Sequence, residues 1–237
     1  MANAVLFDVD GTLVSFTFDV VGTRKAIYDQ LVRAGFDTSG LADTTPTQFI
    51  LDAVRKQAES GKGRVGYAAI RKKIYSLLDR FEDRGARDAI ALPGVMEALL
   101  ELQESSLLGV VTNSGRKAAT AVLRTNGLLD LFDIVLTRDE VPAMKPRPEG
   151  ILKAVSSLSI PKRDSLYVGD SIYDVLAARE AGVTIVSVSS GNYDRSRLLA
   201  ERPDFVVSSL KDVVRIVKRG SNRSTQKTDR LRDVQGP

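Results

Sequence analysis

Residues 5–14 read Val5-Leu6-Phe7-Asp8-Val9-Asp10-Gly11-Thr12-Leu13-Val14. The apolar, β-branched and aromatic residues at its start predict a short central strand of a parallel sheet, buried on both faces. Asp8 and Asp10 stand two residues apart, so their side chains point to the same side where the strand ends. Ligands of open α/β sheets bind at this edge. Paired carboxylates repel each other unless a cation or a proton lies between them. The pattern therefore predicts a metal site and permits a nucleophile beside an acid; the alternative is a strand that ends in an Asp-Gly turn.

The composition narrows the available chemistry. At 237 residues the chain is long enough for one large α/β domain, or for a core with a smaller insert. It contains no cysteine and no histidine, which excludes disulfides, cysteine nucleophiles, Ser-His-Asp catalysis and zinc sites with imidazole ligands. Acid–base catalysis must therefore come from carboxylates, lysine or tyrosine.

The net charge of +4 is concentrated at the C-terminus. Residues 218–237 hold six of the 34 basic and two of the 30 acidic residues, which leaves 28 of each in residues 1–217. This segment is polar and lacks periodicity, and we predict that it is a disordered basic tail. The tail alone favours a nucleic-acid-binding protein, and the neutral charge of the rest of the chain argues against that class.

Membrane and secretion signals are absent from the sequence pattern. No segment approaches about eighteen consecutive apolar residues, and the N-terminus has no basic flank before a long apolar stretch. We therefore expect neither a membrane span nor a signal peptide, and a cytoplasmic location.

Residues 15–90 follow helical rather than strand spacing. Apolar residues recur at helical intervals in 20–34, 45–59 and 67–84, with no convincing strand among them. Gly35 ends the first of these segments, and a glycine-rich loop separates the second from the third. We predict a small helical domain, residues 15–90, inserted directly after the first strand.

From residue 91 onward strands and helices alternate. The expected strands are 107–112, 134–137, 165–168, 183–188 and 205–207, and the expected helices are 95–103, 116–124, 148–158, 172–181 and 210–217. Repeated strand–helix units imply a parallel sheet with right-handed crossovers. The predicted fold is therefore α/β, with a core formed by residues 1–14 and 91–217.

Two further polar groups follow strands at the edge where Asp8 and Asp10 are expected. Thr112 and Asn113 stand at the end of an apolar strand, just before a helix N-terminus, which suits a phosphate. The alternative is a helix cap without a ligand. Asp170 ends another strand and Asp174 lies one turn into the next helix, so both carboxylates can face one pocket. Here the alternative is an ordinary helix start.

The motif Asp8-Val9-Asp10-Gly11-Thr12 resembles the first motif of the haloacid-dehalogenase-like superfamily. Thr112, Lys145 (in Met144-Lys145-Pro146) and the Gly169-Asp170 pair followed by Asp174 are similar to its second, third and fourth motifs, in the same order. The resemblance covers residues 4–209. It implies a Rossmann-like parallel sheet core with an inserted all-helical cap.

The resemblance also implies roles for these residues. Asp8 would attack phosphorus, and Asp10 would protonate the leaving oxygen and then activate water. Thr112, Asn113 and Lys145 would bind the phosphate. The metal ligands would be Asp8, the Asp10 backbone carbonyl and Asp170, with Asp174 as support. Oxygen ligands without histidine or cysteine suit a hard cation, Mg²⁺ before Mn²⁺.

The activity implied is that of a Mg²⁺-dependent phosphatase, which hydrolyses a small phosphomonoester through an aspartyl-phosphate. Dehalogenases lack the second Asp and phosphonatases replace it with a small residue, whereas this chain has Asp10. The related sugar-phosphate mutases use a histidine of the cap, and this chain has no histidine. The resemblance therefore leaves a phosphatase. The layout most resembles phosphoglycolate phosphatases; a nucleotidase or a pyrophosphatase is the alternative within the superfamily. A catalytically degenerate binding module is the alternative from another class, and it would usually have lost a carboxylate or the lysine.

Basic residues of the helical insert are candidates for substrate selection. Lys62, Arg64, Arg71, Lys72 and Lys73 fall in a stretch without acidic residues. Lys62 and Arg64 lie in a glycine-rich loop that could reach a bound anion, whereas the other three could form a solvated helix face.

Overall fold

The computed structural model describes residues 2–189, 191 and 193–219. Its core is a six-stranded parallel sheet with the strand order β5-β4-β1-β6-β7-β8. The strands are β1 (Ala4–Phe7), β4 (Leu107–Val111), β5 (Ile134–Leu136), β6 (Ser165–Gly169), β7 (Thr184–Val188) and β8 (Phe205–Val207). The structure confirms the predicted α/β class.

Strand β1 lies in the middle of this sheet, between β4 and β6, and all four of its residues are buried. Asp8 directly follows the strand, and its backbone N–H still donates to the carbonyl of Val168, the neighbouring residue of β6 (2.9 Å). The backbone of Asp8 is thereby fixed to β6, and the neighbouring strands β4 and β6 are also followed by polar residues. This position is why the sheet edge can gather side chains that are more than 100 residues apart in sequence.

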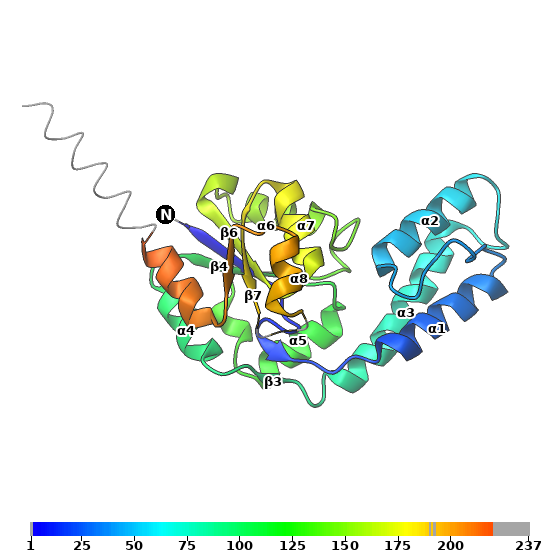
Figure 1. Cartoon of the computed structure of the whole chain (residues 1–237). Coiled ribbons are helices and arrows are strands. Elements are labelled where there is room, and N and C mark those ends of the chain that lie inside the picture. The colour runs from blue at the N-terminus through cyan, green and yellow to red at the C-terminus, as the bar shows by residue number, and fades with distance from the viewer. Residues whose placement is uncertain (1, 190, 192, 220–237) are drawn as a thin grey trace, which may run out of the picture.

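Helices cover both faces of the sheet (Figure 1). The side chains of Val5 and Phe7 pack with α4 (Val95–Gln103), α5 (Arg116–Thr125) and the helix 210–219. The side chain of Leu6 points to the opposite face and packs with α6 (Glu149–Ser157) and α7 (Ile172–Ala181). Successive residues of a strand face opposite sides, so the apolar run of β1 serves both layers.

Residues 15–90 contain α1 (Val20–Arg33), α2 (Thr47–Glu59) and α3 (Tyr67–Gly85), which lie beside the core in Figure 1. These helices share an apolar cluster of their own, formed by residues such as Ile27, Ile50 and Ile74. Among the described residues of this cluster, Met144 alone comes from outside residues 15–90. We propose residues 15–90 as a helical cap and use this name below.

The cap and the core are joined by a short antiparallel strand pair that the sequence analysis did not predict. Strand β2 (Val14–Ser15) pairs with β3 (Ile90–Ala91), one from each connection. Two-residue strands are too short to show periodicity. Gly85 lies near this strand pair, at the end of α3, where an added Cβ would meet the carbonyl oxygen of Thr17 at 2.3 Å. Only glycine allows the two connections to pass so closely.

Other differences from the sequence analysis are small. Helix α8 (Arg195–Ala200) and the 3₁₀ turns η1 (Leu129–Leu131) and η2 (Lys162–Asp164) were not predicted. The last helix extends through residue 219, so Lys218 and Arg219 are helical rather than part of the tail. Lys218 also donates to Glu101 of α4 (2.5 Å). The remainder of the predicted tail, 220–237, lies outside the described residues. Among the helices that the structure describes, none is long and apolar enough to cross a membrane.

Candidate active site

Lys145 is the centre of a buried charge network at the end of β1. Its Nζ lies 2.8 Å from Oδ1 of Asp8 and 2.7 Å from Oδ1 of Asp174. It also donates to the hydroxyl of Tyr167, a fully buried residue of β6 (2.8 Å). The structure therefore brings three of the predicted site residues into direct contact. A buried ammonium between two carboxylates is compensated in charge, which an isolated buried lysine would not be.

This network changes the proton affinities of its members. Burial raises the pKa of Asp8 to about 6, although Lys145 opposes the change. Burial would lower the pKa of Lys145, but Asp174 and Asp8 outweigh it and hold that pKa above its ordinary value. The lysine thus remains a cation that stabilises the charged form of Asp8.

Asp10 has a different environment from Asp8. Its Oδ2 accepts a hydrogen bond from the hydroxyl of Ser114 (2.5 Å), a residue that the sequence analysis missed. Burial and the nearby charge of Asp8 raise the pKa of Asp10 to about 7. Two carboxylates that are neighbours on one strand end are therefore held by different partners, one by a cation and one by a hydroxyl.

The loop 112–115 after β4 connects the predicted residues to one another. The side-chain amide of Asn113 donates to the carbonyl of Lys145 (3.0 Å) and accepts from its N–H (2.8 Å). This amide therefore holds the backbone of Lys145. Thr112 is buried and accepts from the N–H of Ser114 (3.1 Å).

The N-terminus of α5, which the sequence analysis considered for a phosphate, is occupied by protein carboxylates. The N–H of Gly115 donates to Glu82 (3.0 Å), and that of Arg116 donates to Asp139 (2.8 Å). A phosphate beside Thr112 would thus meet the strand end rather than the first turn of this helix.

A cluster of carboxylates could hold a metal ion. Asp8, Asp170 and Asp174 each offer an oxygen, and these oxygens lie within 4.8 Å of one another. Both oxygens of Asp174 are already engaged, Oδ1 by Lys145 and Tyr167 and Oδ2 by Ser171. The donor set of Asp8 and Asp170, with Asp174 as support, fits a cation that prefers oxygen ligands.

Gly191 lies against this cluster. A Cβ at this position would come within 2.3 Å of Oδ2 of Asp170 and 2.5 Å of the carbonyl oxygen of Gly11. The loop after β7 therefore reaches the carboxylate closely only because the residue is glycine.

The structure places the loop of Lys62 and Arg64 apart from the charge network around Lys145, and their role in substrate selection stays a prediction. The N–H of Arg64 donates to the carbonyl of Ala34 (2.7 Å), just beyond the end of α1. Helix α1 begins at Val20, shortly after β2, and has 14 residues. The end of the helix near Ala34 therefore lies about 20 Å from its start. The glycine-rich loop is thus at the end of the cap remote from Asp8, and a loop's flexibility alone did not indicate this placement.

Arg138, Glu82 and Tyr167 also belong to this region, and the sequence analysis gave them no role. For Tyr167 the sequence shows only a tyrosine within an apolar strand. For Arg138 it shows only an arginine directly after a strand. Glu82 lies on α3 among other charged residues, and nothing in its helix distinguishes it from a solvated residue.

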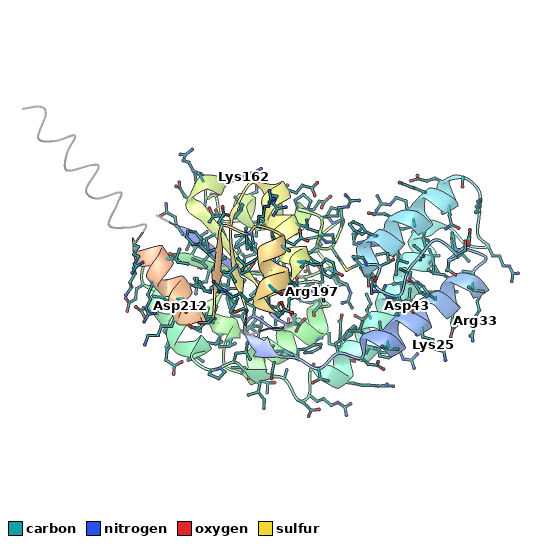
Figure 2. The ribbon with its side chains drawn as sticks, viewed as in Figure 1. Lys25, Arg33, Asp43, Lys162, Arg197 and Asp212 are labelled. Carbon is teal, nitrogen blue, oxygen red and sulfur yellow. The ribbon has the colours of Figure 1, made fainter. Side chains whose placement is uncertain are left out.

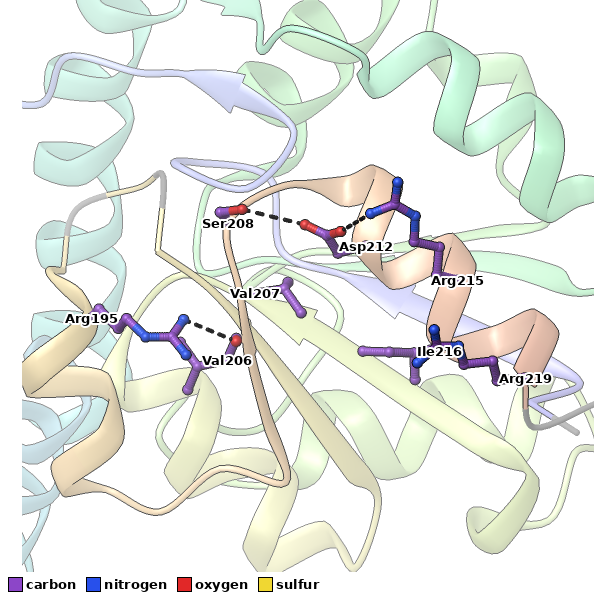
Figure 3. Close-up of a pocket in the computed structure, with 8 residues that line it drawn as sticks. All are labelled: Arg195, Val206, Val207, Ser208, Asp212, Arg215, Ile216 and Arg219. Carbon is purple, nitrogen blue, oxygen red and sulfur yellow. Dashed lines mark hydrogen bonds and ion pairs between the residues drawn. The ribbon is translucent and has the colours of Figure 1, made fainter.

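A cavity of about 370 Å³ lies elsewhere, between β8 and the helix 210–219 (Figure 3). Several of its polar side chains already have partners: Arg195 donates to the carbonyl of Val206, and Arg215 pairs with Asp212. None of the residues that line it belongs to the charge network around Lys145.

Comparisons with known proteins agree with this architecture. The family description "Haloacid dehalogenase-like hydrolase" matches residues 5–188. The chain is 29% identical over 223 residues to a phosphoglycolate phosphatase of Nitrosococcus oceani, covering 92% of this chain and 97% of that protein. It is 27% identical over 227 residues to the pyrophosphatase PpaX of Bacillus cereus, covering 94% of this chain and 99% of that protein.

Solved structures show the same similarity. A hydrolase from Pseudomonas syringae is 25% identical with a TM-score of 0.63, covering 92% of this chain and 98% of that one. A haloacid dehalogenase-like hydrolase from Bacteroides fragilis is 25% identical with a TM-score of 0.61, covering 90% and 100%. The family match covers most of the chain, from within β1 to the end of β7. The protein is therefore an enzyme that belongs to the haloacid dehalogenase-like hydrolase family.

Proposed function

We propose that this hydrolase is a Mg²⁺-dependent phosphatase that cleaves a small phosphomonoester through an aspartyl-phosphate on Asp8. The observation that carries the proposal is the difference between the two carboxylates after β1. Asp8 is paired with Lys145, which favours the ionised nucleophile, whereas Asp10 is held by the hydroxyl of Ser114. Pairs of carboxylates with different environments are typical of sites in which one acts as nucleophile and the other as acid.

The reaction follows from these positions. The carboxylate of Asp8 forms a bond to phosphorus while the bond from phosphorus to the leaving oxygen breaks, and Asp10 gives its proton to that oxygen. Asp10 then takes a proton from a water molecule whose oxygen attacks phosphorus, which releases phosphate and restores the Asp8 carboxylate. Lys145 stays charged throughout and stabilises Asp8 in its ionised form.

Mg²⁺ would be held by Asp8, the Asp10 carbonyl and Asp170, where it would supply positive charge opposite the phosphate oxygens. Asp174 would orient Lys145 and Ser171 rather than bind the metal, because both of its oxygens accept hydrogen bonds from the protein. The phosphate would lie beside Thr112 and the backbone of Asn113.

Phosphoglycolate is the first candidate substrate, since a phosphoglycolate phosphatase is among the relatives. Inorganic pyrophosphate, a phosphoanhydride rather than a monoester, is the alternative substrate, because a relative of similar identity is a pyrophosphatase. A 5′-nucleotide remains a third candidate from the sequence analysis.

The test is release of inorganic phosphate from these three compounds by the purified chain with Mg²⁺. We expect Mg²⁺-dependent release from at least one of them, and none from the Asp8→Ala variant. Release that persists in Asp8→Ala would overturn the assignment of the nucleophile. An inactive but folded and metal-binding protein would favour the catalytically degenerate binding module.

A further inference from the structure

Arg138 is a fully buried cation at the boundary between the cap and the core. It follows β5, and its guanidinium donates to Asp79 through Nη2 and to Glu82 through Nη1, both on α3 of the cap. Nη1 also donates to the carbonyl of Asn113 (3.1 Å). One side chain of the core therefore joins the cap helix to the loop 112–115.

These contacts require α3 to be in its present position. A buried guanidinium without partners is strongly unfavourable, and Asp79 and Glu82 stand three residues apart, so both face Arg138 from one side of the helix. Tyr75, one turn earlier, places its ring 5.3 Å from the guanidinium carbon. If α3 moved away, Arg138 would lose both carboxylates at once.

Glu82 extends this contact to the catalytic side chains. Its second oxygen accepts from the N–H of Gly115 (3.0 Å). The adjacent Ser114 holds Asp10 (2.5 Å), and Asn113 holds the backbone of Lys145. The loop that orients the proposed acid and lysine is thus fixed by a cap residue on one side and by Arg138 on the other.

A surface contact between the same two regions provides a comparison. Asp83 of α3 pairs with Lys117 of α5 (2.5 Å), but both side chains are substantially exposed. Exposed ion pairs contribute little to stability. The buried contacts of Arg138, not this pair, are expected to fix the position of α3.

We propose that Arg138, Asp79 and Glu82 form a latch, centred on the buried guanidinium of Arg138, that holds the cap on the core and positions the loop 112–115 for catalysis. Within the latch Arg138 and Glu82 are positioning residues, since they act through Ser114 and Asn113. The kinetic part of this inference rests on the proposed phosphatase function. The structural part does not.

The position of the cap can be measured without an activity assay. The chain has no cysteine, so spin labels can be attached to Lys25→Cys on α1 and Lys162→Cys in η2, both exposed and well separated in Figure 2. Pulsed electron–electron double resonance then gives the distribution of distances between the label on the cap and the label on the core. We expect Glu82→Gln, Asp79→Asn and Arg138→Met to broaden this distribution, and Asp83→Asn to leave it unchanged. Asp79→Asn is the mildest change, because that side chain is about half exposed, and it serves if Arg138→Met does not fold.

The catalytic effect is measured as single-turnover phosphorylation with phosphoglycolate and with p-nitrophenyl phosphate. A misplaced acid impairs a poor leaving group most, and misplacement of about 1 Å can cost roughly 100-fold. We expect Glu82→Gln to slow phosphorylation by phosphoglycolate roughly 10–100-fold and by p-nitrophenyl phosphate far less. A general loss of folded enzyme would slow both equally.

The two measurements separate the possible failures. Unchanged distance distributions in the folded latch variants would overturn the latch, whatever the kinetics. Equal slowing with both substrates would overturn the positioning of the acid. If the unmodified chain releases no phosphate from p-nitrophenyl phosphate, phosphoglycolate, pyrophosphate or a 5′-nucleotide, the proposed function fails, and the distance measurement still decides on the latch.

Discussion

The hydroxyl of Ser114 donates a 2.5 Å hydrogen bond to Oδ2 of Asp10, across 104 residues of sequence. Ser114 belongs to the loop after β4, and Asp10 follows β1, the neighbouring strand of the sheet. This bond orients the carboxylate that we propose as the acid, while Lys145 holds the carboxylate of Asp8.

Removing this hydroxyl should impair catalysis. Hydrogen bonds to charged groups contribute about 1.5–3 kcal/mol, so we expect Ser114→Ala to lower kcat by roughly 10–100-fold with a smaller change in KM. Ser106→Ala is the matched control, because Ser106 is equally buried but donates to Ala2 (2.8 Å), outside the site. Steady-state kinetics give kcat for both variants, and equal values for Ser114→Ala and Ser106→Ala would contradict the role of Ser114.

Lys145→Met should reduce both activity and stability. The substitution leaves Asp8 and Asp174 buried without their cation, and breaking a buried ion pair costs about 3–5 kcal/mol. The measurements are urea denaturation and phosphate release. Lys153→Met is the control, because Lys153 is exposed and donates to the carbonyl of Glu140, outside the charge network. Stability equal to that of the control would show that Asp8 and Asp174 do not depend on Lys145.

Tyr167→Phe should destabilise the fold. The hydroxyl of Tyr167 accepts from Lys145, and its one proton is shared between the carbonyl of Val111 (2.9 Å) and Oδ1 of Asp174 (3.1 Å), so its removal leaves buried groups with fewer partners. We expect a loss of about 1–3 kcal/mol in the free energy of unfolding, measured by urea titration. Tyr28→Phe, which removes a hydroxyl bonded to Ala42 near the surface, should cost less. The reverse order would mean that the Lys145 network gains little from Tyr167.

Mg²⁺ should stabilise the protein through Asp170. A ligand at 100 times its Kd adds about 2.7 kcal/mol to the free energy of unfolding, which corresponds to roughly 5–10 °C in Tm for a chain of this size. The Asp170→Asn variant should lose most of this shift. Asp212→Asn, on the helix 210–219, should retain it. A shift that survives Asp170→Asn would place the metal elsewhere.

The fold could be predicted from the sequence because its signals are local. The apolar run before Asp8, the alternation of strands and helices after residue 91, and the helical spacing of residues 15–90 each correspond to an element of the structure. The strand pair β2–β3 could not be predicted, since two residues on each side carry no pattern.

The candidate site was predictable to a smaller extent. Asp8, Lys145 and Asp174 come together, and their motifs indicated this. Ser114 and Arg138 carry contacts that depend on which loops meet at the sheet edge, and neither belongs to a motif. Lys62 and Arg64 were placed near the substrate because their loop is rich in glycine, but the direction of α1 puts them at the remote end of the cap.

The most direct test of the proposed mechanism compares two leaving groups in Asp10→Asn, which keeps the shape of the side chain and removes its proton transfer. Glycolate is a poor leaving group and needs the proton, whereas p-nitrophenolate does not. Single-turnover phosphorylation of Asp8 should therefore fall by roughly 10²–10⁴ with phosphoglycolate and far less with p-nitrophenyl phosphate. Equal slowing with the two substrates would contradict the assignment of Asp10 as the acid, and with it the division of roles between Asp8 and Asp10.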